Sequence, residues 1–148
     1  MAALRSIADA VKSEIEPLLR DLGFIGEYPH YRRNRDGRAD LISFQTNKNG
    51  GSFIVEIAQT SGEGVTPFWS EDFIPFDQLN VWHLDPHRDK RKRILAGPFG
   101  VLGWFHYDRI WQRIFLKNHE RLRLAARGAM GKIPKIQAQF DKWHRIPN

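Results

Sequence analysis

The chain has 148 residues, of which 41% are hydrophobic and 27% charged, and its formal net charge is +6. This size allows one globular domain with a substantial core, so the sequence predicts a single domain over residues 1–148. Because cysteine is absent from the sequence, a disulfide scaffold, a thiolate zinc site, an iron–sulfur cluster and a cysteine nucleophile are excluded.

Membrane and secretion signals are not found in the sequence. No stretch approaches the roughly 18 consecutive apolar residues of a membrane-spanning helix. The first 22 residues contain Asp9, Glu14 and Glu16 and lack the apolar core of a secretory signal. The sequence therefore predicts a cytoplasmic protein with no membrane partner.

An amphipathic helix is predicted at the N-terminus. Apolar residues recur at spacings of mostly three and four between Leu4 and Leu22, as on one buried helical face. Ser6 is placed to cap the helix, and Gly23 suits a left-handed end. Pro17 lies inside the pattern and should kink the helix or begin a second one, because it has no N–H to donate.

Three strands are predicted next, over residues 28–33, 41–46 and 52–59. In the second and third, side chains alternate along the strand, and an Asp-Gly pair at 36–37 and the Gly-containing run 47–51 provide hairpin turns. This order predicts an antiparallel meander packed on the first helix.

The middle of the chain has less regular patterns than its two ends. Residues 66–76 contain four aromatic side chains and are predicted to lie over the sheet or to form a short helix. Residues 80–84 are predicted to form a fourth strand, residues 85–93 to be charged and exposed, and residues 94–105 to contain another short strand.

Two helices are predicted in the C-terminal third. Asp108 is expected to cap the first, whose apolar stripe runs from Trp111 to Ala126. Pro134 suits the first turn of the second, whose stripe ends at Trp143. The whole order predicts an α+β fold with an N-terminal helix, an antiparallel meander sheet of about four to five strands and two C-terminal helices.

Charge is divided unevenly along the chain. Residues 1–85 contain 8 basic and 13 acidic side chains, whereas residues 86–148 contain 15 basic and 4 acidic ones. The basic region 88–127 could form a surface for nucleic acid, or its charges could be solvated or attract the acidic half. The candidate nucleic-acid contacts are Lys90, Arg91, Lys92, Arg93, Arg113 and Lys117.

No catalytic motif is recognisable, because neither a phosphate-binding glycine loop nor a Gly-x-Ser-x-Gly elbow is present. His83, Asp85 and His87 alternate as ligands on a strand would, but the proline at 86 interrupts the strand, and a polar turn is favoured over a metal site. The sequence thus predicts a protein that is not an enzyme, with no cofactor and no metal.

The abundant aromatic residues have three explanations. Core packing is the default, and stacking platforms for single-stranded nucleic acid are an alternative. The third is an exposed patch for a protein partner, for which the candidates are Phe68, Trp69 and Phe73.

Four segments of the N-terminal half resemble a bacterial family, the domain of unknown function 4304. They are residues 18–24 (Leu-Leu-Arg-Asp-Leu-Gly-Phe), 31–33 (Tyr-Arg-Arg), 41–46 (Leu-Ile-Ser-Phe-Gln-Thr) and 52–57 (Ser-Phe-Ile-Val-Glu-Ile). The resemblance covers residues 4–60 and departs at Ala58, where the family usually has glycine.

The resemblance implies a small α+β protein with no catalytic residues to transfer. At the matched position of Gln45 a polar side chain recurs, which would either bind a partner on the sheet face or satisfy backbone groups at the strand end. The leading hypothesis is a protein that binds a protein partner, with an immunity- or antitoxin-like role suggested by the family's small single-domain character. Nucleic-acid binding is the alternative, and the oligomeric state is left open.

Overall fold

The computed structural model describes residues 4–96 and 104–146 of the chain. The helices are α1 (Ile7–Ala10), the π-helical turn η1 (Val11–Ile15), α2 (Glu16–Asp21), the 3-10 turns η2 (Phe76–Gln78) and η3 (Val81–His83), α3 (Ile110–Phe115), α4 (Asn118–Met130) and α5 (Ile133–Arg145). The strands are β1 (Ile25–Glu27), β2 (His30–Arg35), β3 (Arg38–Thr46), β4 (Ser52–Ser61), β5 (Gly64–Val65), β6 (Ile74–Pro75), β7 (Lys90–Ile94) and β8 (Phe105–His106).

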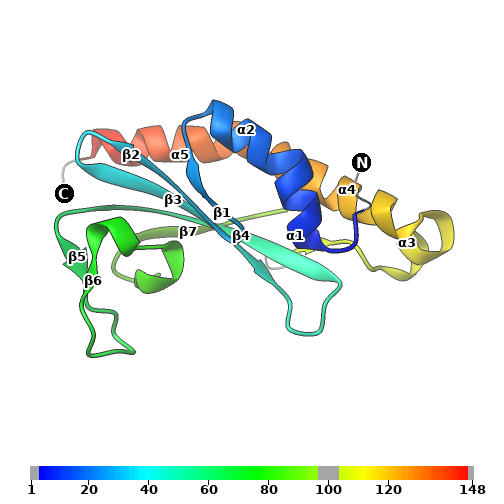
Figure 1. Cartoon of the computed structure of the whole chain (residues 1–148), viewed down its shortest axis with the longest axis horizontal. Coiled ribbons are helices and arrows are strands. Elements are labelled where there is room, and N and C mark those ends of the chain that lie inside the picture. The colour runs from blue at the N-terminus through cyan, green and yellow to red at the C-terminus, as the bar shows by residue number, and fades with distance from the viewer. Residues whose placement is uncertain (1–3, 97–103, 147–148) are drawn as a thin grey trace.

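An antiparallel sheet separates two layers of different kind (Figure 1). The strand order is β1-β2-β3-β4-β7, and β8 pairs with the beginning of β4. Helices cover one face, while β5, β6, η2 and η3 cover part of the other (Figure 1). The prediction of an α+β fold with an N-terminal helix, an antiparallel sheet and two C-terminal helices is confirmed.

The N-terminal helix has the predicted start, interruption and end. The Ser6 hydroxyl accepts a hydrogen bond from the Asp9 amide at 3.2 Å, which caps α1. Pro17 lies in the first turn of α2, directly after the π-helical turn, so the residue without an N–H donor begins a new helical segment. Gly23 follows the helix with φ of 90°, the left-handed conformation that glycine adopts at low cost.

The hairpin register sets which residues face each layer. Asp36 and Gly37 both have positive φ, as the tight turn between β2 and β3 requires. The pairing of Ile42 with Ile57 directs both side chains into the helix-side core, whereas the neighbouring pair of Leu41 and Ala58 lies in a smaller core on the opposite face. β4 is therefore buried on both faces over most of its length.

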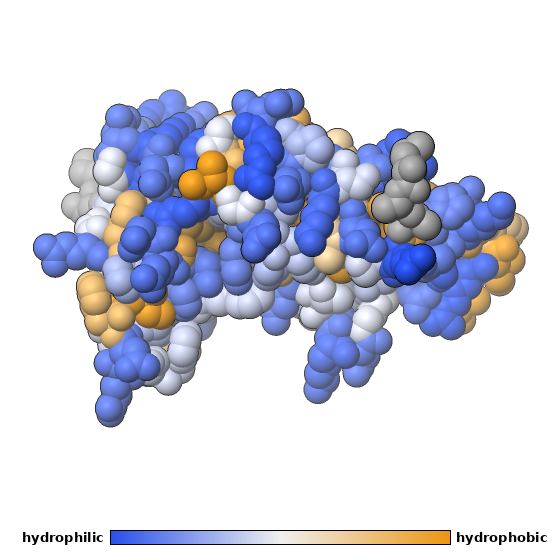
Figure 2. All heavy atoms as spheres, in the orientation of Figure 1, coloured by the Kyte–Doolittle hydropathy of each residue, from blue (hydrophilic) through white to orange (hydrophobic). Residues whose placement is uncertain are grey.

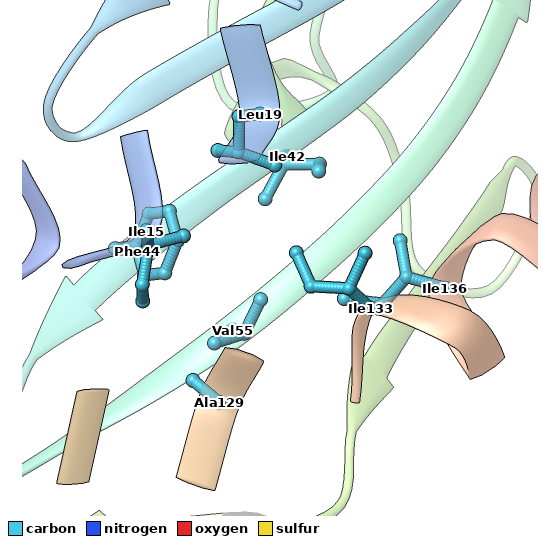
Figure 3. A pocket seen from close by; sticks show the side chains of 8 residues that line it. All are labelled: Ile15, Leu19, Ile42, Phe44, Val55, Ala129, Ile133 and Ile136. Carbon is cyan, nitrogen blue, oxygen red and sulfur yellow. The ribbon is translucent and has the colours of Figure 1, made fainter. Parts of the chain in front are cut away.

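The helix-side core contains one small gap (Figure 3). Its volume is about 10 Å³, and it is lined by Ile15, Leu19, Ile42, Phe44, Val55, Ala129, Ile133 and Ile136. This volume is at the lower limit for one water molecule, and the lining side chains offer no polar partner. The gap is a packing defect between helices and sheet and not a ligand site.

A buried polar network ties the far end of the sheet to α5. Asp40 is fully buried and accepts hydrogen bonds from Arg33 Nε at 3.1 Å and Nη2 at 2.8 Å, and from Gln59 Nε2 at 2.8 Å. Arg33 Nη2 also donates to Gln137 Oε1 of α5 at 2.8 Å. Arg35 Nε forms an ion pair with the same carboxylate at 2.9 Å. One carboxylate thus organises two arginines between the sheet and the last helix.

Several sequence predictions for the second half were wrong. Residues 80–84 form a 3-10 turn and not a strand, because the Asn80 side chain accepts from the Trp82 amide and starts a helical turn. Residues 85–93 are charged and largely exposed as predicted, but residues 90–94 also form a strand that pairs with β4, which the sequence did not indicate. For the strand predicted within residues 94–105, the structure shows β8, which begins at Phe105. Residues 97–103 of that range lie outside the described residues.

The helix expected to begin at Asp108 also differs from the prediction. It is broken at Leu116, whose backbone is extended, into α3 and α4. Asp108 does not cap it: its carboxylate accepts from Arg113 of α3 at 2.6 Å and from Arg121 of α4 at 2.7 Å. These bonds lower the pKa of Asp108 and hold the two helices together. The stripe of α5 is confirmed, with Ile136 and Phe140 fully buried.

Candidate functional site

A hairpin built from β5, β6 and the connecting residues 66–73 carries the exposed aromatic side chains; we call residues 64–75 the aromatic hairpin. Phe68 is 80% exposed, Trp69 58% and Phe73 56%. The hairpin lies on the face of the sheet opposite the helices, and Figure 2 shows apolar residues gathered over it. Three large aromatic groups therefore face solvent on one projecting element.

Contacts at its base attach the aromatic hairpin to the sheet. The Phe76 amide donates to the Glu63 carbonyl at 2.8 Å, which closes the hairpin below β5 and β6. Arg32 of β2 donates through Nη1 to the Phe76 carbonyl at 3.0 Å, and its guanidinium lies 5.1 Å from the centre of the Phe76 ring. Val65 and Ile74 pack against the smaller core.

The tip of the hairpin has its own hydrogen bonds. The Ser70 amide donates to the Pro67 carbonyl at 3.0 Å, and the Asp72 amide donates to the Ser70 hydroxyl at 3.1 Å. Gly64 has φ of 149°, and a Cβ there would overlap the backbone carbonyl oxygen of Ile74 and lie 2.9 Å from Cα of Pro75. The aromatic side chains are thus presented by a folded turn, and glycine is required where β5 passes close to the backbone of β6.

Negative charge surrounds these aromatic groups. Four exposed carboxylates flank the aromatic hairpin or lie within it: Glu63, Glu71, Asp72 and Asp77. The sequence has no lysine or arginine from residue 49 to residue 87. The surface is therefore both aromatic and acidic, a combination that favours a partner with apolar pockets and basic residues.

Two histidines lie beside the base of the hairpin. The Asn80 amide donates to Nδ1 of His83, whose ring lies 6.3 Å from that of Trp69. Burial lowers the pKa of His83, and burial followed by the charge of His83 lowers the pKa of His30. His30 Nδ1 lies 2.8 Å from the hydroxyl of Ser43, but Ser43 is fully buried, so this pair has no access to a substrate.

Two other groups of predicted residues lie apart from the hairpin. Gln45 is exposed near the end of β3. The beginning of β3, at Arg38, pairs with Ser61 just before the hairpin. Gln45 lies seven residues further along β3 than Arg38, which is about 23 Å of strand. Asp85 accepts a hydrogen bond from the His87 amide at 2.8 Å, as in a polar turn. Within the described residues, no three His, Asp or Glu side chains could hold a metal ion together.

The candidate basic residues are distributed over several surfaces. Arg91 donates through Nε to the buried Glu56 at 2.9 Å and through Nη1 to the Leu84 carbonyl at 2.7 Å. Lys90 donates to the Trp143 carbonyl at 3.2 Å. Lys92 and Arg93 are exposed and line a groove between β7 and α5.

Arg113 and Lys117 lie at the other end of the molecule, at α3 and the start of α4 (Figure 1). The apolar residues of α3 are exposed there: Ile110 at 77%, Ile114 at 68% and Phe115 at 77%. They form the apolar end of the molecule seen at the right in Figure 2. Ile114 and Phe115 lie within the apolar stripe that the sequence predicts from Trp111 to Ala126, and their exposure contradicts that prediction, because the break at Leu116 separates α3 from the buried stripe of α4.

Sequence reasoning missed two parts of these surfaces. The first is the acidic character of the aromatic hairpin. Its signal in the sequence is a run of 39 residues that contains carboxylates but no lysine or arginine. Lys135 and Gln139 of α5 line the groove beside Lys92 and Arg93, and no local sequence signal brings residues 92 and 135 together.

Comparison with protein families gives one result. The family model described as "Domain of unknown function (DUF4304)" matches residues 15–93, just over half of the chain. The chain belongs to this family. The DUF4304 match begins later than the resemblance over residues 4–60 and extends through the aromatic hairpin into β7. No curated protein and no solved structure matches the chain.

The helices were also compared with the length and hydropathy of membrane spans. In residues 4–96 and 104–146, none of the helices is long and apolar enough to cross a bilayer.

Proposed function

We propose that this DUF4304 protein acts by binding a protein partner, and that the aromatic hairpin is its contact surface. The observation that carries the proposal is the exposure of Phe68, Trp69 and Phe73 on one hydrogen-bonded hairpin. Aromatic side chains that are held in place and solvated in the free protein are the groups that become binding hot spots when a partner covers them.

The chemistry of the partner follows from the surroundings of these side chains. Each large apolar side chain that becomes buried contributes about 1.5–3 kcal/mol, so the partner must offer apolar pockets. Glu71 and Asp72 lie between Trp69 and Phe73 in the sequence, so basic residues on the partner's rim would speed association and select against acidic proteins. An immunity- or antitoxin-like role is one form of such binding.

The proposal includes a cytoplasmic setting, with which the absence of cysteine from the sequence is consistent. We also propose that the protein acts by binding alone and is not an enzyme.

The experiment compares three immobilised proteins as bait in lysate of the source organism. They are the wild type, the hairpin variant Phe68→Ser/Trp69→Ser, and the control variant Ile110→Ser/Phe115→Ser, which removes equally exposed apolar groups from α3. A partner specific to the hairpin is recovered by the wild type and the control and is lost with the hairpin variant. The purified partner is then titrated by calorimetry.

We expect the hairpin variant to weaken the measured binding by at least about 30-fold, since two hot-spot aromatics are removed. Equal circular dichroism melting curves verify that all three proteins are folded. The proposal is wrong if the wild type recovers no partner that the hairpin variant fails to recover, or if the control variant weakens binding as much as the hairpin variant.

A further inference from the structure

A groove runs between the edge strand β7 and helix α5, on a different part of the molecule from the aromatic hairpin. It has a volume of about 180 Å³ and is lined by Lys92, Arg93, Ile94, Leu95, Lys135 and Gln139. A water molecule occupies about 30 Å³ of liquid, so the groove has room for roughly six waters or for a hydrated anionic group. Of the six lining residues that the structure describes, three are cationic and none is acidic.

One contact across the groove joins Lys92 to α5. Lys92 Nζ donates to Gln139 Oε1 at 3.4 Å, which holds the strand's lysine against the helix. Lys92 and Lys135 are both exposed. Among residues 4–96 and 104–146, neither lysine forms an ion pair with a carboxylate. Two positive charges therefore meet at the groove without a neutralising group of the chain itself.

Positive charge continues along the seam toward the C-terminal end of α5. Lys90 Nζ donates to the Trp143 carbonyl at 3.2 Å, and Arg38 Nη1 donates to the same carbonyl at 3.0 Å. Burial, followed by the charge of Arg38, lowers the pKa of Lys90, as expected where cations are crowded. From residue 135 to residue 143 the helix advances about 12 Å, which is roughly three nucleotide steps of 3.4 Å.

We propose that this groove binds the sugar–phosphate backbone of a nucleic acid, through Lys92, Arg93 and Lys135. The guanidinium fork of arginine and the ammonium groups of lysine are the donors that phosphate oxygens prefer. Among the described residues, the groove lining contains no aromatic side chain on which a base could stack, so these residues would contact the backbone and not the bases. Binding here is independent of the partner proposed for the aromatic hairpin.

The test measures fluorescence anisotropy of a labelled 20-nucleotide single-stranded DNA over a range of salt concentrations. Three phosphate contacts give a slope of log affinity against log salt of about −2, since each contact on a single strand contributes about −0.7. The groove variant Lys92→Gln/Lys135→Gln leaves one contact and should reduce the slope to about −0.7. At 50 mM salt its affinity should fall at least about tenfold.

The control variant Arg113→Gln/Lys117→Gln removes the same formal charge from α3 and the residue before α4, outside the groove lining. It should keep the wild-type slope within error, whereas equal losses in both variants would show a diffuse electrostatic effect and overturn the proposal. Circular dichroism melting of each variant establishes that the comparison is between folded proteins.

Two further outcomes also decide against the groove. The first is that the wild type binds no DNA at low salt. Lys92 and Arg93 would then serve only to keep the edge strand β7 from pairing with other chains, as charged side chains on edge strands do. Competition by poly-glutamate as effective as by unlabelled DNA of equal charge would assign the groove to an acidic polypeptide. Competition by DNA alone supports the proposal.

Discussion

Removal of the Asp40 carboxylate should be among the most destabilising single changes in this protein. The Asp40 side chain is 1% exposed and that of Arg33 is 11% exposed. Water therefore has little access to replace the hydrogen bonds that Arg33 loses in the variant Asp40→Ala. Arg33 Nη2 and Gln59 Nε2 would each lose an acceptor at 2.8 Å. The breaking of a buried ion pair costs about 3–5 kcal/mol.

The lower end of that range applies, because Arg33 keeps the Leu22 carbonyl and Gln137 as acceptors. A loss of about 3 kcal/mol corresponds to a decrease in Tm of roughly 6–12 °C for a chain of this size. Urea unfolding followed by circular dichroism at pH 7 measures the free energy of unfolding and its m-value.

The control for this change is Asp141→Ala. Asp141 accepts a hydrogen bond from Arg35 at 2.9 Å but is 56% exposed, and exposed pairs contribute less than about 1 kcal/mol. If Asp40→Ala costs less than about 1 kcal/mol, or no more than Asp141→Ala, the buried network does not hold α5 to the sheet as described.

Two further predictions concern the turn at β5 and the histidines. Gly64→Ala should lower Tm by more than Gly62→Ala: both glycines have positive φ, but a Cβ at Gly64 would overlap the backbone carbonyl oxygen of Ile74, whereas nothing lies within 4 Å of a Cβ at Gly62. Equal decreases in thermal melting would contradict this. Burial lowers the pKa values of His30 and His83 below 6.5, so the unfolded chain binds more protons and stability should fall as the pH drops below about 6.5. His30→Gln should make the difference in Tm between pH 7.5 and pH 5.5 smaller, and an unchanged difference would refute this assignment.

Local patterns predicted the elements whose stability is local or repetitive. The stripe of α5, the cap at Ser6 and the turn at Asp36 and Gly37 are confirmed, because each depends on residues three or four positions apart or adjacent. The strand β7 was not predicted, since its sequence Lys-Arg-Lys-Arg-Ile has little intrinsic preference for a strand. It forms because its backbone pairs with β4 and Ile94 is buried in the helix-side core, and Arg91 also reaches the buried Glu56 on the neighbouring strand.

The candidate surfaces were predictable to different degrees. The sequence named Phe68, Trp69 and Phe73 as a patch, and the structure shows all three exposed on one hairpin. The basic groove depends on the packing of α5 beside β7, so Lys135 could not be joined to Lys92 from the sequence. Contacts between residues this far apart in the chain are decided by tertiary packing, which periodicity does not encode.

The covering layer of the sheet is an insertion between two strands that are direct neighbours. The chain leaves β4 at Ser61 and returns in β7 at Lys90, which pairs with Gln59. Within the insertion, Leu79, Val81 and Leu84 complete the smaller core and cannot change freely without exposing the sheet. Pro67 is buried, but residues 68–73 belong to neither core. Related chains could therefore exchange this tip for one with other side chains and keep the same scaffold, so that recognition can diverge while folding stays the same.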